Sequence, residues 1–270
     1  MNCGDAISHA MRKRPLYISF GMPKSGSTLA FQLTRTMLEL SGIDQSKIGE
    51  GIVDEKTNIN YVHKLDGPSL NALIVEARNL PGPIAIKTHS RLFPKVAGAF
   101  KRGAVFGHAV CRDPRDVALS MLDAARDGRD WGSSRDGTFR TVADTVERLR
   151  SGIEIFKRWV ALPNVMPIHY ERVAFDTETV AAEIAAQLGI ETDIPRAVEI
   201  ATGREFTQLN RGKSQRWKTE MDPADARMLE REFREYIETW CCDVPSAPKA
   251  RKPAVGFFAK WFSSRHFGLR

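Results

Sequence analysis

The segment from Gly21 to Thr28, G-M-P-K-S-G-S-T, has the composition of a loop that binds a phosphate or sulfate group. It follows a short apolar run and precedes a segment with helical periodicity. A turn of Gly, Ser and Thr at the start of a helix exposes backbone N–H groups, and these bind anions. The usual nucleotide loop, G-x-x-x-x-G-K-S/T, has its lysine after the second glycine. Here Gly21 and Gly26 have the same separation, but the lysine is Lys24, inside the loop. The segment therefore predicts an anion site of a different kind.

The segment A-I-K-T-H-S, residues 85–90, carries a cation and a base. Lys87 and His89 alternate along an extended run, so their side chains point to the same face. A histidine by itself is more often structural than catalytic, but a lysine on the same face at a strand end favours chemistry. The pair predicts a general base with a neighbouring positive charge.

The segment A-V-C-R-D-P-R-D-V-A-L-S-M provides a second candidate for anion binding. Arg112 ends an apolar run, Pro114 stands where a helix can begin, and Ser120 falls two helical turns later. A guanidinium with a nearby hydroxyl suits a phosphate monoester, because it can bind two oxygens at once. The alternative is an ion pair between Arg112 and Asp113 or Asp116 in a surface network.

Apolar runs and helix-like segments alternate along the chain and would position these groups. The predicted strands are Leu16–Phe20, Ile84–Lys87, Ala104–Cys111 and Val165–Tyr170. The predicted helices are Ser27–Leu40, Arg115–Arg126, Thr138–Leu162, Thr177–Leu188 and Pro223–Trp240. Strands without polar alternation, separated by helices, indicate a parallel sheet covered on both faces. We therefore predict an α/β fold: a single P-loop-like domain over residues 1–245, with a central parallel sheet flanked by helices on both faces.

In sheets of this kind, ligands bind outside the carboxyl ends of the strands. The predicted strand ends deliver Lys24 and Ser25, Lys87 and His89, Arg112, and Tyr170. We expect these side chains to form one site, although for Tyr170 a core position at a strand end is nearly as good an interpretation.

The composition limits what the chain can be. It has 270 residues, 42% of them hydrophobic, which suits one sizeable core. No apolar run approaches the roughly 20 residues that span a bilayer, and the first residues lack the apolar core of a secretion signal. The cysteines have neither metal-binding nor disulfide spacing, at Cys3, Cys111, Cys241 and Cys242. We therefore predict a cytoplasmic protein without a metal.

The positive charge is concentrated near the end of the sequence. Six of the seven net charges lie in residues 246–270, which leaves residues 1–245 near +1 and argues against a nucleic-acid-binding body. Residues 254–270 contain no acid and have an apolar helical face. The side chains on that face are Val255, Phe258, Trp261 and Phe262. Such a tail suits peripheral contact with the inner membrane surface. The alternative is that this face packs on the domain or closes its acceptor pocket.

Taken in order, the motifs resemble those of the cytosolic-type sulfotransferases, which use 3′-phosphoadenosine 5′-phosphosulfate (PAPS) as donor. That family has a P-K-S-G-S/T-T loop, a K-T-H segment, a 3′-phosphate motif in which a serine follows an arginine by eight residues, and a Tyr-Glu pair after a strand. The matching residues are Pro23 to Thr28, Lys87 to His89, Arg112 with Ser120, and Tyr170 with Glu171. The resemblance extends in order from about residue 16 to residue 218.

The resemblance implies in-line transfer of the sulfuryl group of PAPS to a hydroxyl acceptor. His89, held neutral, would take the acceptor's proton, while Lys24 and Lys87 would stabilise charge on the sulfuryl oxygens and the leaving phosphate. Lys24 would thereby take the part that a metal plays at a triphosphate, so no metal is expected. The donor would be held by Lys24, Ser25, Gly26, Ser27 and Thr28 at its 5′-phosphate, by Arg112, Ser120, Arg211, Gly212 and Lys213 at its 3′-phosphate, and by Tyr170 and Phe206 near the adenine.

Two departures from the family pattern shift parts of this site. Leu29 stands where the family has a Trp that stacks on the adenine, so Phe206, in T-G-R-E-F, is predicted to take that part. The family's late element, R-K-G-x-x-G-D-W-K, is matched in part by N-R-G-K-S-Q-R-W-K. Asn210 replaces the first Arg, and Gln215-Arg216 replace Gly-Asp. These replacements shift the predicted 3′-phosphate contacts to the Arg-Gly-Lys run at residues 211–213.

Two functions of other classes stay open at this point. A P-loop kinase with ATP and Mg²⁺ would use Asp113, after an apolar strand, as a metal ligand, although the position of Lys24 argues against it. A non-catalytic protein would instead bind a membrane or a partner through its basic tail. The oligomeric state and the acceptor also stay open, since lipid, glycan, phenol and metabolite hydroxyls all fit.

Overall fold

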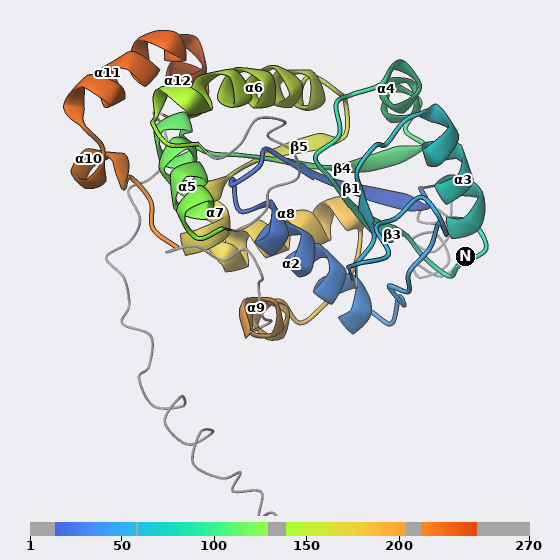
Figure 1. Cartoon of the computed structure of the whole chain (residues 1–270). Helices are drawn as coiled ribbons and strands as arrows, with labels where there is room; N and C mark the ends of the chain where they lie inside the picture. The colour runs from blue at the N-terminus through green and yellow to red at the C-terminus, as the bar shows by residue number, and fades with distance from the viewer. Residues whose placement is uncertain (1–13, 58, 129–138, 204–211, 242–270) are drawn as a thin grey trace, which may run out of the picture.

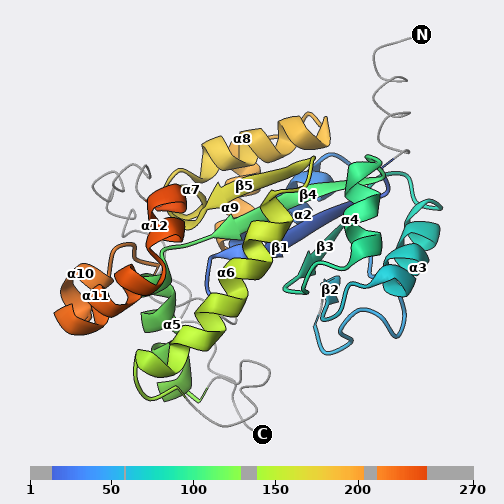
Figure 2. The same cartoon turned by 90° about the horizontal axis from the view of Figure 1, so that it is seen from above.

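The computed structural model describes residues 14–57, 59–128, 139–203 and 212–241 (Figure 1). Within these residues the centre is a parallel five-stranded sheet in the order β2-β3-β1-β4-β5, which Figure 2 shows from above. The strands are β1 Leu16–Gly21, β2 Tyr61–Val62, β3 Ile84–Thr88, β4 Val105–Cys111 and β5 Val165–His169. β1, β3 and β4 are buried along their whole length, as expected of strands covered on both faces. The predicted parallel sheet is confirmed.

Helices cover both faces of the sheet and enclose two hydrophobic cores (Figure 1). On one face lie α2 Ser27–Leu40, α8 Thr177–Leu188 and α9 Ile194–Gly203. On the other lie α3 Gly67–Ala77, α4 Pro94–Lys101, α5 Pro114–Arg126, α6 Val146–Val160 and α12 Arg234–Trp240. The side chains of β1 alternate between the cores, with Tyr17 on the α2 side and Ile18 on the α6 side. The remaining elements are the 3₁₀ turn Ala143–Thr145, α7 Tyr170–Phe175, α10 Trp217–Glu220 and α11 Pro223–Glu232.

Seven predicted elements have different limits in the structure. Four of them, β1, β3, β4 and α5, differ by one residue at one end, and the other three have a specific cause. The strand predicted over residues 165–170 stops one residue early, because Tyr170 begins α7 and buries its ring. The helix predicted over residues 138–162 begins later, with the 3₁₀ turn that leads into α6. The helix predicted over residues 223–240 is broken between α11 and α12, because the buried Phe233 has φ −117° and ψ 26° and turns the chain.

Five helices, α3, α4, α7, α9 and α10, and the two-residue strand β2 were not predicted. For α3 the signal was present in the sequence: Asp66 accepts a hydrogen bond from the backbone N–H of Ser69, and Pro68 lies in the first turn. Likewise α4 begins at Pro94. The apolar periodicity of α3 is weak, and α4 is only eight residues long.

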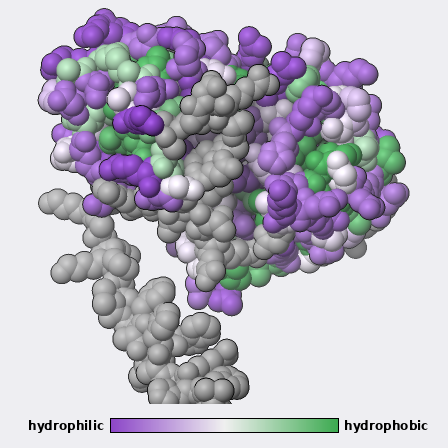
Figure 3. All heavy atoms as spheres, viewed as in Figure 1, coloured by the Kyte–Doolittle hydropathy of each residue, from purple (hydrophilic) through white to green (hydrophobic). Residues whose placement is uncertain are grey.

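The face of the molecule seen in Figure 3 is mostly hydrophilic, with hydrophobic residues in small separate patches. Among the described residues, Leu40 and Val75 are the large hydrophobic side chains that are exposed. None of the described helices has the length and apolar composition needed to cross a bilayer.

Candidate active site

A tight loop at residues 22–26 joins β1 to α2 at the carboxyl edge of the sheet. Lys24 and Gly26 have positive φ angles of 67° and 81°, which curl the main chain into the first turn of α2. Gly26 is the N-cap of this helix, and no side chain of the described residues makes a capping hydrogen bond there. The loop therefore brings the positive end of the α2 dipole to the site, as an anion requires.

Side-chain contacts fix the shape of this loop. A Cβ atom on Gly21 would clash with Cβ of Ser27, so the loop admits only glycine at its start. Ser25 is buried, and its hydroxyl donates a hydrogen bond to the Met22 carbonyl at 2.6 Å. Ser25 therefore helps to build the loop, in addition to any contact it makes with a ligand.

Tyr170 closes one side of the loop. A Cβ atom on Gly26 would lie 2.8 Å from Cδ2 of Tyr170, so the ring packs directly on the loop. The same ring lies 3.8 Å from Cζ of Arg112, at cation–π distance. The structure thus places Tyr170 between the loop and Arg112, and its contact with an adenine stays a prediction.

His89 follows β3 and points at the start of the loop. Its Nδ1 lies 2.6 Å from the carbonyl oxygen of Gly21. A carbonyl can only accept, so Nδ1 carries the proton and Nε2 keeps its lone pair. Burial, followed by the charge of Lys87, lowers the pKa of His89 to about 3. His89 is therefore an uncharged base at neutral pH.

Lys87 lies in β3, two residues before His89, as the alternation predicted. Its Nζ donates to the hydroxyl of Thr28 at 2.8 Å, which ties the strand to the first turn of α2. Burial lowers the pKa of Lys87 to about 8. Lys87 is consequently still a cation at neutral pH, but its charge is sensitive to a modest rise in pH.

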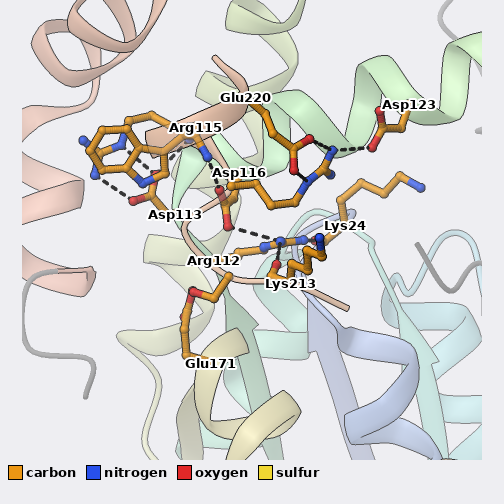
Figure 4. Close-up of polar contacts among 12 residues, drawn as sticks. Lys24, Arg112, Asp113, Arg115, Asp116, Asp123, Glu171, Lys213 and Glu220 are labelled. Carbon is orange, nitrogen blue, oxygen red and sulfur yellow. Dashed lines mark hydrogen bonds and ion pairs between the residues drawn. The ribbon is translucent and has the colours of Figure 1, made fainter. Parts of the chain in front are cut away.

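Arg112 contacts both parts of the site, the loop of residues 22–26 at one end and the segment that begins at Gly212 at the other (Figure 4). It donates to the carbonyl of Lys24 at 3.2 Å and to the carbonyl of Lys213 at 2.7 Å. It also forms an ion pair with Asp116 at 3.2 Å. The ion pair with Asp116 that the alternative reading predicted is present, although both side chains are buried and not in a surface network. Phosphate binding by Arg112 stays a prediction.

The segment from Gly212 to Glu220 is fastened by carboxyl groups that the sequence analysis did not single out as anchors. The hydroxyl of Ser214 donates to Glu171 at 2.9 Å, and the backbone N–H of Trp217 donates to Asp116 at 3.1 Å. Burial raises the pKa of both carboxyl groups, and the charge of Arg112 partly offsets this. The Tyr-Glu and Arg-Asp pairs in the motifs could have pointed to Glu171 and Asp116 as anchors. Their partners, Ser214 and Trp217, lie far away in the sequence, so no local pattern shows the contacts.

The other predicted donor-site residues are distributed as follows. Ser27 and Thr28 begin α2, and Gly212 and Lys213 begin the segment that faces Arg112. Ser120 is buried on α5 one turn beyond Asp116, and therefore on the same helix face. Phe206 and Arg211 lie outside the described residues, so their contacts stay predictions.

Asp113 does not have the environment of a metal ligand. Its carboxylate accepts from the backbone N–H of Arg115 at 2.9 Å and from the guanidinium of Arg115 at 2.9 and 2.7 Å. Oδ1 caps α5 and both oxygens bind the Arg115 guanidinium, which disfavours the kinase reading. In the described ranges, no three His, Cys, Asp or Glu side chains are grouped as a metal site.

Together these residues can hold a multiply charged anion beside a neutral base. Positive charge around the start of α2 comes from Lys24 in the loop, from Lys87, which bonds Thr28, and from Arg112, which bonds the Lys24 carbonyl. His89 supplies a proton acceptor at the same edge of the sheet. The arrangement suits removal of a proton from an uncharged acceptor group next to a bound anion.

Comparisons with known proteins agree with this geometry. A family model described as "Sulfotransferase domain" matches residues 17–240. No curated protein matches the chain significantly. Two solved structures are similar in fold, both with a TM-score of 0.54. One is retinol dehydratase in complex with androsterone and inactive cofactor PAP, 19% identical over 86% of this chain and 83% of that one. The other is a mouse sulfotransferase complexed with PAP, 16% identical over 86% of this chain and 89% of that one.

Proposed function

Because the chain belongs to the sulfotransferase family, we propose that it transfers the sulfuryl group of PAPS to a hydroxyl acceptor, with His89 as the general base. The observation that carries this proposal is the 2.6 Å contact between His89 Nδ1 and the Gly21 carbonyl. The contact leaves Nε2 as a proton acceptor beside the anion loop. A base that is uncharged at neutral pH, next to a loop for an anion, is what sulfuryl transfer to a hydroxyl needs.

The residues of the site fit a donor that carries phosphate groups at two ends. Arg112 is 6% exposed, and its Nε has no hydrogen-bond partner among the described residues, so a buried N–H is left for a ligand oxygen. We therefore assign the 5′-phosphosulfate to loop residues 24–28 and the 3′-phosphate to Arg112, Ser120 and residues 211–213. The PAP named in the complexes of both structural neighbours supports this choice of donor.

In the proposed reaction, the bond between sulfur and the 5′-phosphate oxygen breaks and a bond between sulfur and the acceptor oxygen forms. His89 Nε2 takes the proton of the acceptor hydroxyl, which is worth roughly 10²–10⁴-fold in rate. Lys24 and Lys87 stabilise the negative charge that develops on the sulfuryl group and the leaving phosphate. The product nucleotide is adenosine 3′,5′-bisphosphate (PAP).

The donor is tested by thermal melting of the full-length protein. PAP and PAPS should each raise Tm, because they bind the folded chain. Adenosine 5′-phosphate should raise it much less, since it lacks the 3′-phosphate assigned to Arg112. Equal shifts from PAP and adenosine 5′-phosphate would remove the case for a 3′-phosphate site.

We also propose that residues 246–270 form a tail separate from the domain of residues 1–245, and that the tail holds this cytoplasmic enzyme at the inner membrane surface. Residues 254–270 combine basic and aromatic side chains without an acid, which suits anionic lipid. The acceptor is then a lipid-borne hydroxyl. Retinol dehydratase, a protein of similar fold, is known in complexes with retinol and with androsterone, which supports an acceptor of apolar character.

Acceptor class and tail are tested separately. Labelled PAPS is incubated with whole-cell lipid and polar-metabolite extracts, and label should appear in the lipid fraction with the full chain but not with His89→Ala. Truncation after Pro245 should abolish sedimentation with anionic liposomes, and high salt should weaken it in the intact chain. Label confined to polar metabolites, or liposome binding that survives truncation, would contradict the membrane proposal.

A further inference from the structure

The segment from Gly212 to Glu220 departs from the sulfotransferase pattern next to Arg112. Gln215 and Arg216 stand where the family has Gly-Asp. Gln215 has a φ angle of 55°, in the left-handed region that glycine adopts freely and other residues rarely do. A side chain in this conformation persists only where its surroundings hold it, so the contacts around Gln215 have to supply that restraint.

Arg216 provides the most extensive of these contacts. It is 4% exposed, and its guanidinium binds Glu220 in a bidentate manner at 2.7 and 3.1 Å. The same guanidinium forms an ion pair with Asp123 of α5 at 2.8 Å. Bidentate, charge-assisted bonds fix both the position and the plane of a guanidinium. Figure 4 shows Asp123 and Glu220 converging on this group. The residue directly after Gln215 is therefore held in one place.

The face of α5 that binds Arg216 also carries the link to Arg112. Asp116 and Asp123 are seven residues apart on α5, so they lie on the same side of the helix. Asp116 is fully buried and bonds both the N–H of Trp217 and the guanidinium of Arg112. One helix face thus sets the position of the segment and of the arginine that the segment contacts.

The position of Lys213 depends on this restraint. The Lys213 carbonyl accepts from Arg112 at 2.7 Å, two residues before Gln215. If Gln215 left the left-handed region, the main chain on its N-terminal side would change direction and carry this carbonyl away from Arg112. The hydrogen bond that orients the guanidinium would then be lost.

We propose that Arg216 is a positioning residue of the donor site, and that its ion pairs with Asp123 and Glu220 set the selectivity for a 3′-phosphate. The proposal rests on the function proposed above, since it assigns the 3′-phosphate to Arg112. Arg216 acts through Gln215 and Lys213 and does not itself touch the donor. In this chain the ion pairs of a buried arginine hold position 215 in the left-handed conformation, which a glycine would adopt without such support.

The test compares the affinities of PAP and adenosine 5′-phosphate, measured by calorimetry on full-length variants. Arg216→Ala should weaken PAP binding by about tenfold, the equivalent of one lost charged hydrogen bond. It should change the affinity for adenosine 5′-phosphate by less than about twofold. The KM for PAPS should rise in parallel, with kcat little changed. The matched control is Arg150→Ala, which removes an exposed arginine paired with Glu147 and Glu232, and it should leave both affinities unchanged.

A second change distinguishes positioning from general loss of structure. Adding Gln215→Gly to Arg216→Ala should restore most of the PAP affinity, because glycine adopts the left-handed conformation without help. If Arg216→Ala does not fold, Arg216→Lys keeps the charge but loses the bidentate geometry, and should give a smaller loss of the same selectivity.

Each outcome bears on one of the two proposals. Equal weakening of PAP and adenosine 5′-phosphate in the Arg216 variants, or no rescue by Gln215→Gly, would overturn the positioning role. A wild-type chain that binds the two nucleotides equally would instead overturn the proposed 3′-phosphate site itself. Selective loss of PAP binding with rescue would establish the inference.

Discussion

The two ends of the site are held in place by different means. At one end, the loop of residues 22–26 continues from β1, which pairs with β3, and the side chains of Ser25 and His89 bond main-chain carbonyls in and just before it. At the other end, the segment of residues 212–220 has no strand to hold it and is anchored by carboxyl groups of α5 and α7. The first end keeps its family motif, and in the second the motif is altered.

The comparison shows how much sequence change is compatible with a packed loop at a strand end and with a segment held by ion pairs. A loop built from a strand end and closely packed glycines has little freedom, since a Cβ at Gly21 or Gly26 would meet neighbouring side chains. A segment held by ion pairs can exchange residues as long as the charges still find partners. The replacement of Gly-Asp by Gln215-Arg216 is such an exchange.

The largest effect is expected at the first end, where His89 lies beside the loop of residues 22–26. His89→Ala should lower kcat by roughly 10²–10⁴-fold, because the acceptor proton then has no base. PAP affinity should be nearly unchanged, since the base acts on the acceptor. His89→Gln, which can still donate to the Gly21 carbonyl, should lose as much activity and thus separates chemistry from structure. Near-normal turnover in either variant would move the search to carboxyl groups such as Glu171.

A matched pair of glycine substitutions compares the two ends directly. Gly26→Ala combines a φ of 81° with a Cβ only 2.8 Å from the Tyr170 ring, so it should weaken PAP binding by at least roughly tenfold. Gly212 has a φ of 59°, and no atom of the described residues lies within 4 Å of the Cβ that Gly212→Ala would add. This variant should lose only the left-handed penalty, about 1–2 kcal/mol of unfolding free energy. Urea unfolding measures the loss of stability, and calorimetry measures PAP affinity. Equal losses of PAP affinity in the two variants would contradict the difference between the two ends of the site.

The pH dependence of kcat/KM for PAPS should come from Lys87, which lies at the first end. With its pKa lowered to about 8, Lys87 is protonated below that pH and loses its charge above it, so kcat/KM for PAPS should fall above about pH 8. His89, with a pKa of about 3, stays neutral and should cause no fall near pH 6.5. Lys87→Arg keeps its charge at all these values and should abolish the alkaline fall. A fall that survives in that variant would assign it to another group.

The smallest effect is expected from the aromatic contact at the second end. The Arg115 guanidinium lies 3.7 Å from the Trp217 ring centroid and is paired with Asp113. Arg115→Lys retains the charge but loses the planar stacking, which is worth about 0.5–1 kcal/mol. PAP affinity should therefore fall about two- to fivefold. A loss as large as that of Gly26→Ala would mean that this contact, and not the α5 carboxyl groups, holds the segment.

The sequence was sufficient to predict the structure of the first end of the site, but not the contacts that hold the second. The predicted helix over Ser27–Leu40 matches α2 at both ends, because an anion loop followed by strong periodicity marks the start of a helix. Lys87 and His89 lie where their alternation placed them. The bonds of Arg216 to Asp123 join residues far apart in sequence, and no local pattern marks such a pair. Tyr170 was predicted to end a strand because it follows the run Val165–His169 directly, and no Gly, Pro, Asn or Ser marks the turn that begins α7.

The contacts of Arg112 also have a consequence for how the protein is made. Its partners Lys24 and Lys213 lie 88 and 101 residues away in the sequence, on either side of it. A nascent chain therefore cannot complete the donor site until most of the domain has left the ribosome and the segment around Lys213 has docked on α5. Fragments that end before this segment should not bind PAP, even if the sheet has formed. In the complete chain, bound nucleotide raises the free energy of unfolding of the domain, so this stabilisation reaches only molecules in which the segment around Lys213 is in place.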